Sequence, residues 1–431
     1  MVEVQEEQER KTRCLLVCPP SKAGGTGDES RPRELESLVD TLGMEVAHTL
    51  VLARIVPTAS YGIGTGKARE VADVAHEVAA DCIIFDWEVD PTKQRNWERL
   101  AGCPVLDRSE VIIRIFDQRA QTKEAHLQVE LARLQYSLPR LAHMYGDLAR
   151  QRGGAYGAKG AGETQLELDR RQVEERIAAI KDELLQVEAV RKTQRSERLR
   201  SATATCALVG YTNAGKSSLL NALTGASVFV EDKLFATLDP TTRKLPLAAG
   251  SAVLLTDTVG FISNLPHALI KAFKSTLEEA SLADFLLLVV DASDEECIRQ
   301  YEQVQKVLDE IGAGGVPFAV VLNKIDLVQD AARLSRLAEA FPSALHTSAK
   351  THEGFEDVTR TLSENLLGSL RKLCIPLERS SLVEIVRKNG TIERERWLDD
   401  SIELLARVRG TFDAAGRAST RTLAMIKDYI V

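Results

Sequence analysis

The eight residues Gly210–Ser217 have the types and the spacing of a loop that binds phosphate groups. Their sequence, GYTNAGKS, fits the pattern GxxxxGK[ST] and follows the apolar run ATCALV. Gly210 and Gly215 let successive backbone N–H groups converge on phosphate oxygens, and the helix that begins near Lys216 adds the positive end of its dipole. Lys216 is placed to reach the β- and γ-phosphates, and Ser217 brings a hydroxyl to the position where Mg²⁺ needs a ligand. A glycine turn before an ordinary helix is the alternative, but a strand before the loop and a helix after it favour the phosphate site.

Three further motifs follow, each near the end of an apolar run. They are DTVG at Asp257–Gly260, NKID at Asn323–Asp326 and SAK at Ser348–Lys350. Together and in this order they resemble the motif set of P-loop GTPases. Asp326 accepts hydrogen bonds from the N1–H and the exocyclic amine of guanine, which adenine cannot match. GTP is therefore the predicted substrate and GDP the product.

The motifs also assign roles near the γ-phosphate. Asp257 holds the Mg²⁺ shell through water, and the Gly260 N–H senses the γ-phosphate. Thr237, 20 residues after Ser217, is the favoured threonine ligand of Mg²⁺, and Thr241 and Thr242 remain alternatives. The predicted metal ligands are Ser217, Thr237 and Asp257, and the predicted catalytic residues are Lys216, Thr237, Gly260 and Asn213. The residues predicted to contact GTP are Gly210, Tyr211, Thr212, Asn213, Ala214, Gly215, Lys216, Ser217, Phe235, Ala236, Thr237, Leu238, Asp239, Asp257, Thr258, Val259, Gly260, Asn323, Lys324, Ile325, Asp326, Ser348, Ala349 and Lys350.

The residue after DTVG points to incomplete catalysis. Many GTPases carry a glutamine there to orient the attacking water, whereas this chain has Phe261, which has no polar side-chain atom. Slow intrinsic hydrolysis, accelerated by a partner, is the resulting hypothesis. Asn213 gives the loop the form GxxNxGKS, in which a related group of GTPases holds K⁺, so K⁺ is a second candidate cation.

Alternating apolar and helical patterns predict an α/β protein with four parts. The first is a small N-terminal α/β domain at 1–117, and the second is a long antiparallel helical hairpin at 118–200 with a glycine-rich tip loop at 151–164. The third is a P-loop GTPase domain with a doubly wound, mostly parallel sheet at 201–368, and the fourth is a small α+β domain at 369–431. Leucines recur at spacings of four and three from Leu127 to Leu141, and a second seam runs from Val173 to Val187. Pro139 should kink or break the first arm, and Glu163 should open the second.

The tip of the hairpin combines cations with glycines, which suits close approach to a phosphate backbone. The residues predicted to contact RNA are Arg152, Gly153, Gly154, Lys159, Gly160, Gly162, Arg170 and Arg171. A flexible connection that contacts nothing is the alternative. A second glycine loop, Gly62–Lys67, lacks the full spacing of a phosphate loop and is more typical of a structural turn.

Composition limits the class of protein. The chain has 431 residues, is 44% hydrophobic and 27% charged, and carries a net charge of −8. This charge argues against a surface coated for nucleic-acid binding but leaves room for a local basic patch. No run approaches the ~20 apolar residues of a membrane span, and the charged start lacks a signal-peptide core. The seven cysteines form no CxxC pair. We expect a cytoplasmic, monomeric protein with at most a passing peripheral contact with membranes.

Longer segments extend the resemblance to nearly the whole chain. GAGETQLELDRR at the tip, LFATLDPTTR, and DTVGFISNLPHALIKAFKSTLEEA resemble the HflX family of bacterial GTPases. The resemblance implies an N-terminal domain and hairpin before the GTPase domain, binding to the large ribosomal subunit, and splitting or rescue of stalled ribosomes. Two residues depart from the family's tip sequence: Ala161 replaces a proline and Lys159 an arginine. The C-terminal tail occurs only in some members.

Two other readings stay open. The hairpin could bind a protein partner in a nucleotide-gated scaffold, or the N-terminal domain could remodel RNA with ATP through the Gly62–Lys67 loop. Co-sedimentation with large ribosomal subunits distinguishes the scaffold from a ribosome-binding GTPase. ATP binding that persists after Lys216→Ala would favour the RNA-remodelling alternative.

Overall fold

The computed structural model describes residues 10–20, 30–151, 159–200, 204–226, 233–247, 251–263, 269, 272–408 and 420–431. By their contacts, the described residues fall into two compact units. The first contains those of 1–192, 231–239 and 263–275, and the second contains the rest. Two short segments within the predicted GTPase domain therefore belong to the N-terminal unit.

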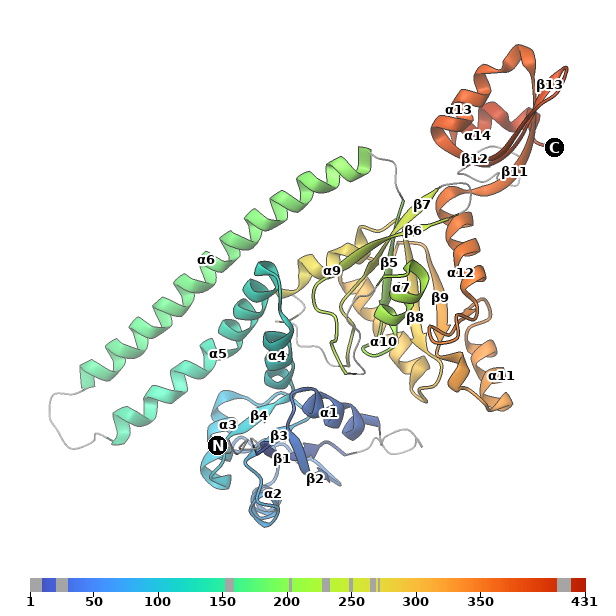
Figure 1. Ribbon diagram of the computed structural model, residues 1–431. Helices are drawn as coiled ribbons and strands as arrows, with labels where there is room; N and C mark the ends of the chain where they lie inside the picture. The colour runs from blue at the N-terminus through green and yellow to red at the C-terminus, as the bar shows by residue number, and fades with distance from the viewer. Residues whose placement is uncertain are drawn as a thin grey trace, which may run out of the picture. The chain divides into compact units, whose positions relative to one another are not determined.

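The first unit is built on a parallel four-stranded sheet in the order β2-β1-β3-β4 (Figure 1). Its strands and helices are β1 (Arg13–Cys18), α1 (Ser30–Thr41), β2 (Glu45–Val51), α2 (Thr65–Glu77), β3 (Cys82–Phe85), α3 (Pro91–Ala101), β4 (Val105–Asp107) and α4 (Arg108–Arg119). Leu15, Ile83, Phe85 and Trp97 fill the core between the sheet and its helices. The apolar runs of β1 and β3 are buried along their length, as a parallel sheet covered on both faces requires.

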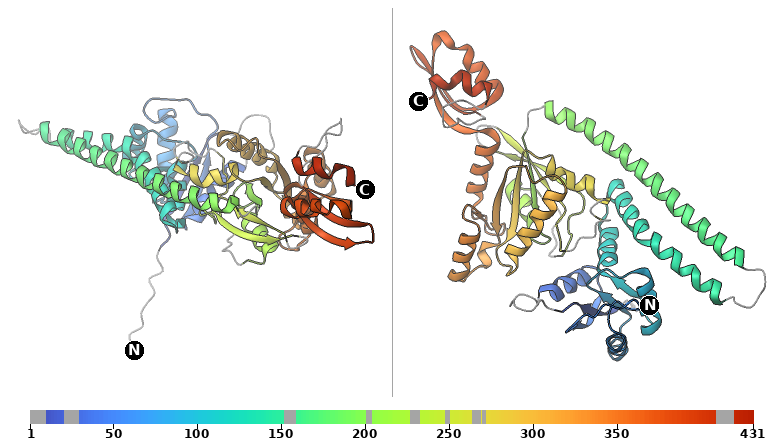
Figure 2. Two further views of the ribbon diagram at one scale, coloured as in Figure 1. Left: turned by 90° about the horizontal axis from the view of Figure 1, so that it is seen from above. Right: turned by 180° about the vertical axis from the view of Figure 1, so that it is seen from behind.

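Two long antiparallel helices follow, and they belong to the first unit up to Lys192 (Figures 1 and 2). They are α5 (Lys123–Gln151) and α6 (Lys159–Arg200). Arg176 pairs with Glu130 at 2.7 Å and Lys123 with Glu183 at 3.3 Å, so late residues of one arm meet early residues of the other. Of the kink or break expected at Pro139, the break does not occur: α5 continues through the proline. The second arm also begins at Lys159 and not at Glu163.

The second unit holds a six-stranded sheet in the order β10-β9-β8-β5-β7-β6 (Figure 1). Only β6 runs antiparallel to its neighbour. The elements are β5 (Ala204–Gly210), α7 (Lys216–Thr224), β6 (Thr241–Pro246), β7 (Ala252–Asp257), α9 (Lys274–Ser281), β8 (Phe285–Asp291), α10 (Cys297–Glu310), β9 (Phe318–Asn323), α11 (Ala331–Ala340), β10 (Leu345–His346) and α12 (Phe355–Leu362). Strand β5 lies centrally between β7 and β8, so its carboxyl end opens at the middle of the sheet edge, where ligands bind in doubly wound folds.

A small antiparallel sheet, β11-β13-β12, ends the second unit. It consists of β11 (Ser369–Pro376), β12 (Gly390–Trp397) and β13 (Ser401–Val408), with α13 (Ser381–Asn389) and α14 (Arg421–Ile426) beside it (Figure 1). The predicted fold class is confirmed. Among the helices within the described ranges, none is both long and apolar enough to cross a membrane.

Candidate functional site

The GxxxxGKS loop joins β5 to α7, and its two glycines meet the carboxyl ends of β8 and β9. Gly210 has φ +156°, and a Cβ atom there would lie 2.2 Å from the Val289 carbonyl oxygen. Gly215 has φ +87°, and its Cβ would lie 2.3 Å from Nδ2 of Asn323. Both positions therefore require glycine, because a side chain would collide and the backbone at Gly215 is left-handed.

Lys216 is buried at the start of α7, with 6% of its surface exposed. Its Nζ donates hydrogen bonds to the carbonyl oxygens of Tyr211 at 2.7 Å and Gly210 at 3.2 Å. Burial lowers the pKa of the amine to about 8, and the nearby Asp257 carboxylate opposes that shift. Charged phosphate oxygens are stronger hydrogen-bond partners for an ammonium group than these two carbonyl oxygens, so the GxxxxGKS loop favours binding of a polyphosphate.

Ser217 and Asp257 bring a hydroxyl and a carboxylate together beside the loop. The Ser217 Oγ donates to Oδ2 of Asp257 at 2.6 Å, and Asp257, at the end of β7, is fully buried. Oxygen ligands of these two kinds fit Mg²⁺. The bound ion would neutralise charge on the phosphates.

The structure bears differently on the three candidate threonines. Thr242 lies in β6, and its hydroxyl is 2.9 Å from that of Thr256 in β7. Thr241 opens β6 opposite Asp257. Thr237 precedes the strand and groups by its contacts with the first unit. Since a hydroxyl bonded across a sheet is poorly placed to reach an ion, Thr242 is the weakest candidate and Thr237 stays the prediction.

Gly260 and Phe261 lie against the first residues of the phosphate loop. A Cβ on Gly260 would lie 2.8 Å from the Thr212 Cα and 3.0 Å from Nζ of Lys216. The Phe261 N–H donates to the Gly210 carbonyl at 3.1 Å, and the Thr212 N–H donates to the Phe261 carbonyl at 2.7 Å. The segment after DTVG is thus held to the loop by its backbone, and the buried Phe261 ring offers no group that could orient water.

Asn323 connects the phosphate loop to the two guanine motifs. Its Nδ2 donates to the Ala214 carbonyl at 3.0 Å, and its Oδ1 accepts from the Ala349 N–H at 3.2 Å and from the Thr347 hydroxyl at 3.4 Å. The amide of this buried residue is therefore engaged with the protein itself. Asn323 holds the three motifs together, a role more specific than the GTP contact predicted from sequence.

The remaining guanine-motif residues surround this connection. Lys324 has a left-handed backbone (φ +60°), and its Nζ lies 2.7 Å from Oδ2 of Asp291. The Ser348 hydroxyl accepts from the N–H groups of Thr351 and Lys350 at 3.1 and 3.3 Å, which shapes the SAK turn. Asp326 lies half-buried at the turn after β9. Asp291 was not among the residues predicted from the sequence, although it ends a strand as the predicted motif residues Asp257 and Asn323 do.

Two of the residues predicted to contact GTP direct their side chains toward α4 and the residues that follow it. The buried Phe235 ring packs edge-on against Phe116, with 4.6 Å between centroids. The Asp239 carboxylate accepts hydrogen bonds from the N–H groups of Gln121 and Thr122, each at 3.3 Å. Only the backbone of these two residues is left for the nucleotide, so their contact with GTP stays a prediction.

The predicted RNA-contact residues are only partly described. Arg152, Gly153 and Gly154 lie outside the described residues. Lys159, Gly160 and Gly162 form the start of α6, where a loop was expected. Further along α6, Arg170 pairs with Glu174 at 2.8 Å, whereas Arg171 is exposed. Helix replaces the predicted loop here although glycine is an unfavourable helix residue.

The second glycine loop is a turn into α2. Gly62 has φ +77°, and Nζ of Lys67 pairs with Oε1 of Glu70 at 2.5 Å. This lysine thus has a partner on its own helix, an arrangement that fits the structural interpretation.

Comparisons with known proteins agree with this geometry. Residues 29–117, 119–198 and 205–324 match family models described as GTP-binding GTPase N-terminal, GTP-binding GTPase Middle Region and 50S ribosome-binding GTPase. The chain is 48% identical to GTPase HflX of Akkermansia muciniphila, covering 94% of this chain and 96% of that protein. It is 40% identical to GTPase HflX of Escherichia coli strain K12, covering 93% and 94%. A solved GTP-binding protein from Sulfolobus solfataricus in complex with GDP is 25% identical and covers 83% of this chain and 99% of that one, with a TM-score of 0.43.

A phosphate loop at the central strand, with guanine motifs at the neighbouring strand ends, defines a P-loop GTPase that hydrolyses GTP to GDP and phosphate. The predicted activity is confirmed. The chain belongs to the HflX family of GTPases. The resemblance to this family, drawn from the hairpin tip and from the segments LFATLDPTTR and DTVGFISNLPHALIKAFKSTLEEA, is therefore confirmed as well.

Proposed function

We propose that this GTPase binds the large ribosomal subunit in its GTP-bound form and splits or rescues stalled ribosomes. The observation that carries the proposal is a GTPase site in one chain with a helical hairpin of 29- and 42-residue arms. Exposed cations such as Arg171 lie on the second arm, whose first residue is Lys159, and they suit RNA phosphates. The description of one matching family model as a 50S ribosome-binding GTPase supports the same partner.

Co-sedimentation with large subunits tests the proposal. We expect the protein to pellet with subunits in the presence of a non-hydrolysable GTP analogue and to remain largely in the supernatant with GDP. Arg171→Glu should weaken pelleting by about tenfold, because it replaces a phosphate contact by repulsion. Lys181→Glu, an equal charge change at an exposed position further along α6, is the matched control. Equal pelleting in both nucleotide states would favour a scaffold that binds another partner.

The missing glutamine gives a second expectation. Because Phe261 is buried and apolar, purified protein should hydrolyse GTP slowly, and large subunits should raise turnover at least about tenfold by completing the site. Phosphate release measured with and without subunits checks this. Equal rates would contradict the idea that the ribosome supplies the missing catalytic group.

Asn213 supports a role for K⁺. It is exposed at the loop with φ +60°, a conformation that asparagine tolerates well. A monovalent cation held there would place positive charge near the transferred phosphoryl group. We expect turnover in potassium buffer to exceed that in sodium buffer by about threefold or more, and Asn213→Ala to remove the difference. Equal rates in the two buffers would mean that Asn213 shapes the loop without binding K⁺.

A further inference from the structure

Helix α4 contacts, within the first unit, two chain segments: one contains the candidate Mg²⁺ threonine Thr237, and the other follows the DTVG motif. These segments are residues 233–239, here called switch I, and the described residues among 263–275, namely 263, 269 and 272–275, here called switch II. In GTPases, segments at these places are ordered by the γ-phosphate and released on hydrolysis. Whatever binds them can therefore sense which nucleotide is present.

The first contact is at the amino-terminal end of α4. The Arg108 guanidinium, with 4% of its side chain exposed, lies 2.7 Å from Asp86 Oδ1 and 2.8 Å from Glu34 Oε2. Its Nη2 also donates to the Ser263 carbonyl at 3.1 Å and to the Ser263 Oγ at 3.3 Å. The Ser263 hydroxyl in turn donates to Glu34. Switch II, which begins three residues after Gly260, is thus anchored in a buried charged cluster.

The second contact is in the last turn of α4. The Phe116 ring packs edge-on against Phe235 of switch I, at 4.6 Å between centroids, and against Phe273 of switch II, at 4.7 Å. Phe235 has φ +55°, which is unfavourable for a bulky residue. The aromatic cluster packs around this strained residue and so compensates for its backbone conformation.

The third contact follows the carboxyl-terminal end of α4. Asp239 of switch I accepts hydrogen bonds from the N–H groups of Gln121 and Thr122 and from the Thr122 hydroxyl. The Thr122 hydroxyl also accepts from the Ala125 N–H at 3.1 Å, which caps the first turn of α5. Switch I is therefore fixed to the residues that join α4 to the hairpin.

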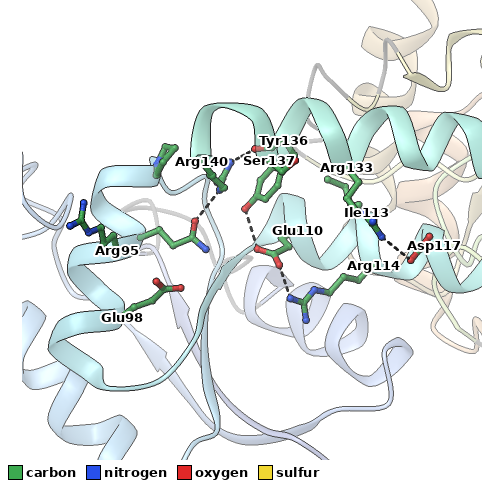
Figure 3. A pocket seen from close by; sticks show the side chains of 12 residues that line it. Arg95, Glu98, Glu110, Ile113, Arg114, Asp117, Arg133, Tyr136, Ser137 and Arg140 are labelled. Carbon is green, nitrogen blue, oxygen red and sulfur yellow. Dashed lines mark hydrogen bonds and ion pairs between the residues drawn. The ribbon is translucent and has the colours of Figure 1, made fainter. Parts of the chain in front are cut away.

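The helix α4 is itself fastened to the first arm of the hairpin. Glu110 of α4 accepts from Arg114 at 2.6 Å and from the Tyr136 hydroxyl of α5 at 3.4 Å (Figure 3). Arg140 of α5 donates to Gln94 of α3 at 2.9 Å and pairs at 3.2 Å with Asp107, the last residue before α4. A displacement of α4 would therefore be passed to α5, since packed helices move as rigid elements.

We propose that α4 senses the bound nucleotide through both switches and passes its state to the hairpin, with Arg108 as the positioning residue of switch II. The inference rests on the GTPase activity and not on ribosome binding. The direction follows from distances at the loop. A Cβ added to Gly260 would lie 3.0 Å from Nζ of Lys216, so the Gly260 backbone is close to the amine that a γ-phosphate contacts, and we infer that binding this phosphate moves Gly260 away. Moving Gly260 pulls on Ser263, so the Arg108 anchor opposes GTP and is weakened by it.

Ser263→Ala tests the anchor while leaving the Arg108 ion pairs in place. It removes the hydroxyl bonds to Glu34 and Arg108, so we expect the affinity for a non-hydrolysable GTP analogue to rise by about three- to tenfold, with GDP affinity changed by less than about twofold. Ser37→Ala, which removes a hydroxyl bonded to the Arg33 carbonyl on α1, is the matched control and should change neither affinity. An equal change in both affinities, or no change, overturns the proposal.

Hydrogen–deuterium exchange on the full-length wild-type protein keeps the proposal testable if the variant folds poorly. Peptides covering residues 108–122 should exchange faster with the GTP analogue than with GDP, and Ser263→Ala should at least halve that difference. If phosphate-loop peptides respond to the nucleotide while these peptides do not, α4 is not the sensor. No ribosome is present in either experiment, so failure of the proposed function would leave these outcomes unaffected.

Discussion

Replacing Lys216 with alanine is expected to lower kcat/KM for GTP by about 100- to 1,000-fold, because it removes an ammonium aimed at the transferred phosphoryl group. Lys216 is buried at the start of α7 and is held beside the loop carbonyls of Gly210 and Tyr211. Burial already lowers the pKa of its amine to about 8, so the site places a poorly solvated cation where phosphate charge can stabilise it. Phosphate release at GTP concentrations below KM measures the effect.

Lys67→Ala is the matched control for this prediction. Lys67 follows a glycine loop at the start of α2 and pairs with Glu70, so its loss should leave GTP turnover unchanged within about twofold. The two variants also test whether the Gly62–Lys67 loop of the N-terminal domain binds ATP or is a structural turn. ATP binding that survives Lys216→Ala and is lost in Lys67→Ala would support a second nucleotide site. Turnover that survives Lys216→Ala would show that the GxxxxGKS loop is not the catalytic phosphate site.

The nucleotide-binding elements could be predicted because their signals are local. Strands β5, β7, β8 and β9 are apolar runs that a sheet covered on both faces requires, and each motif follows such a run directly. A loop between a buried strand and a helix is specified by its own glycines and lysine. Little beyond the neighbouring residues was needed to place it.

Strand β6 was missed because it lies at the edge of the sheet. Its sequence, TTRKLP, buries only Leu245, and the strand pairs with β7 at the end of the strand order. An edge strand needs no continuous apolar run, and charged residues with a terminal proline suit an edge. The start of α6 was misplaced for a different reason. Glycines at 160 and 162 favour a loop locally, and the helix extends through them nonetheless.

Contacts between residues far apart in sequence were beyond prediction. The Asn323 side chain bonds to Ala214, and Arg108 bonds to Ser263, across separations of 109 and 155 residues. A single sequence carries no signal of such pairings. Arg108 reads in isolation as an ordinary cation at a helix start, and only the fold brings Glu34, Asp86 and switch II around it.

The contact with guanine that the sequence predicts for Asp326 gives the second large prediction. An Asp326→Asn variant should bind GTP about 100- to 1,000-fold more weakly, because the new amide sets a donor against the N1–H and amine donors of guanine. The side chain keeps its size, and the surrounding Asn323 connection to Ala214 and Ala349 is untouched. The change therefore acts on recognition of the base and not on the phosphate loop.

Xanthosine triphosphate makes the prediction specific. Xanthine carries a carbonyl oxygen at C2 where guanine carries its amine, so the side-chain amide introduced by Asp326→Asn can donate to it and restore pairing. We expect the variant to hydrolyse xanthosine triphosphate faster than GTP, the reverse of the wild-type order, in parallel phosphate-release assays. Asp330→Asn is the matched control: Asp330 caps α11 by accepting from the Ala332 N–H, and asparagine caps helices equally well, so the GTP preference should be retained. Equal loss of both nucleotides in Asp326→Asn would mean that Asp326 supports the turn after β9 without contacting the base.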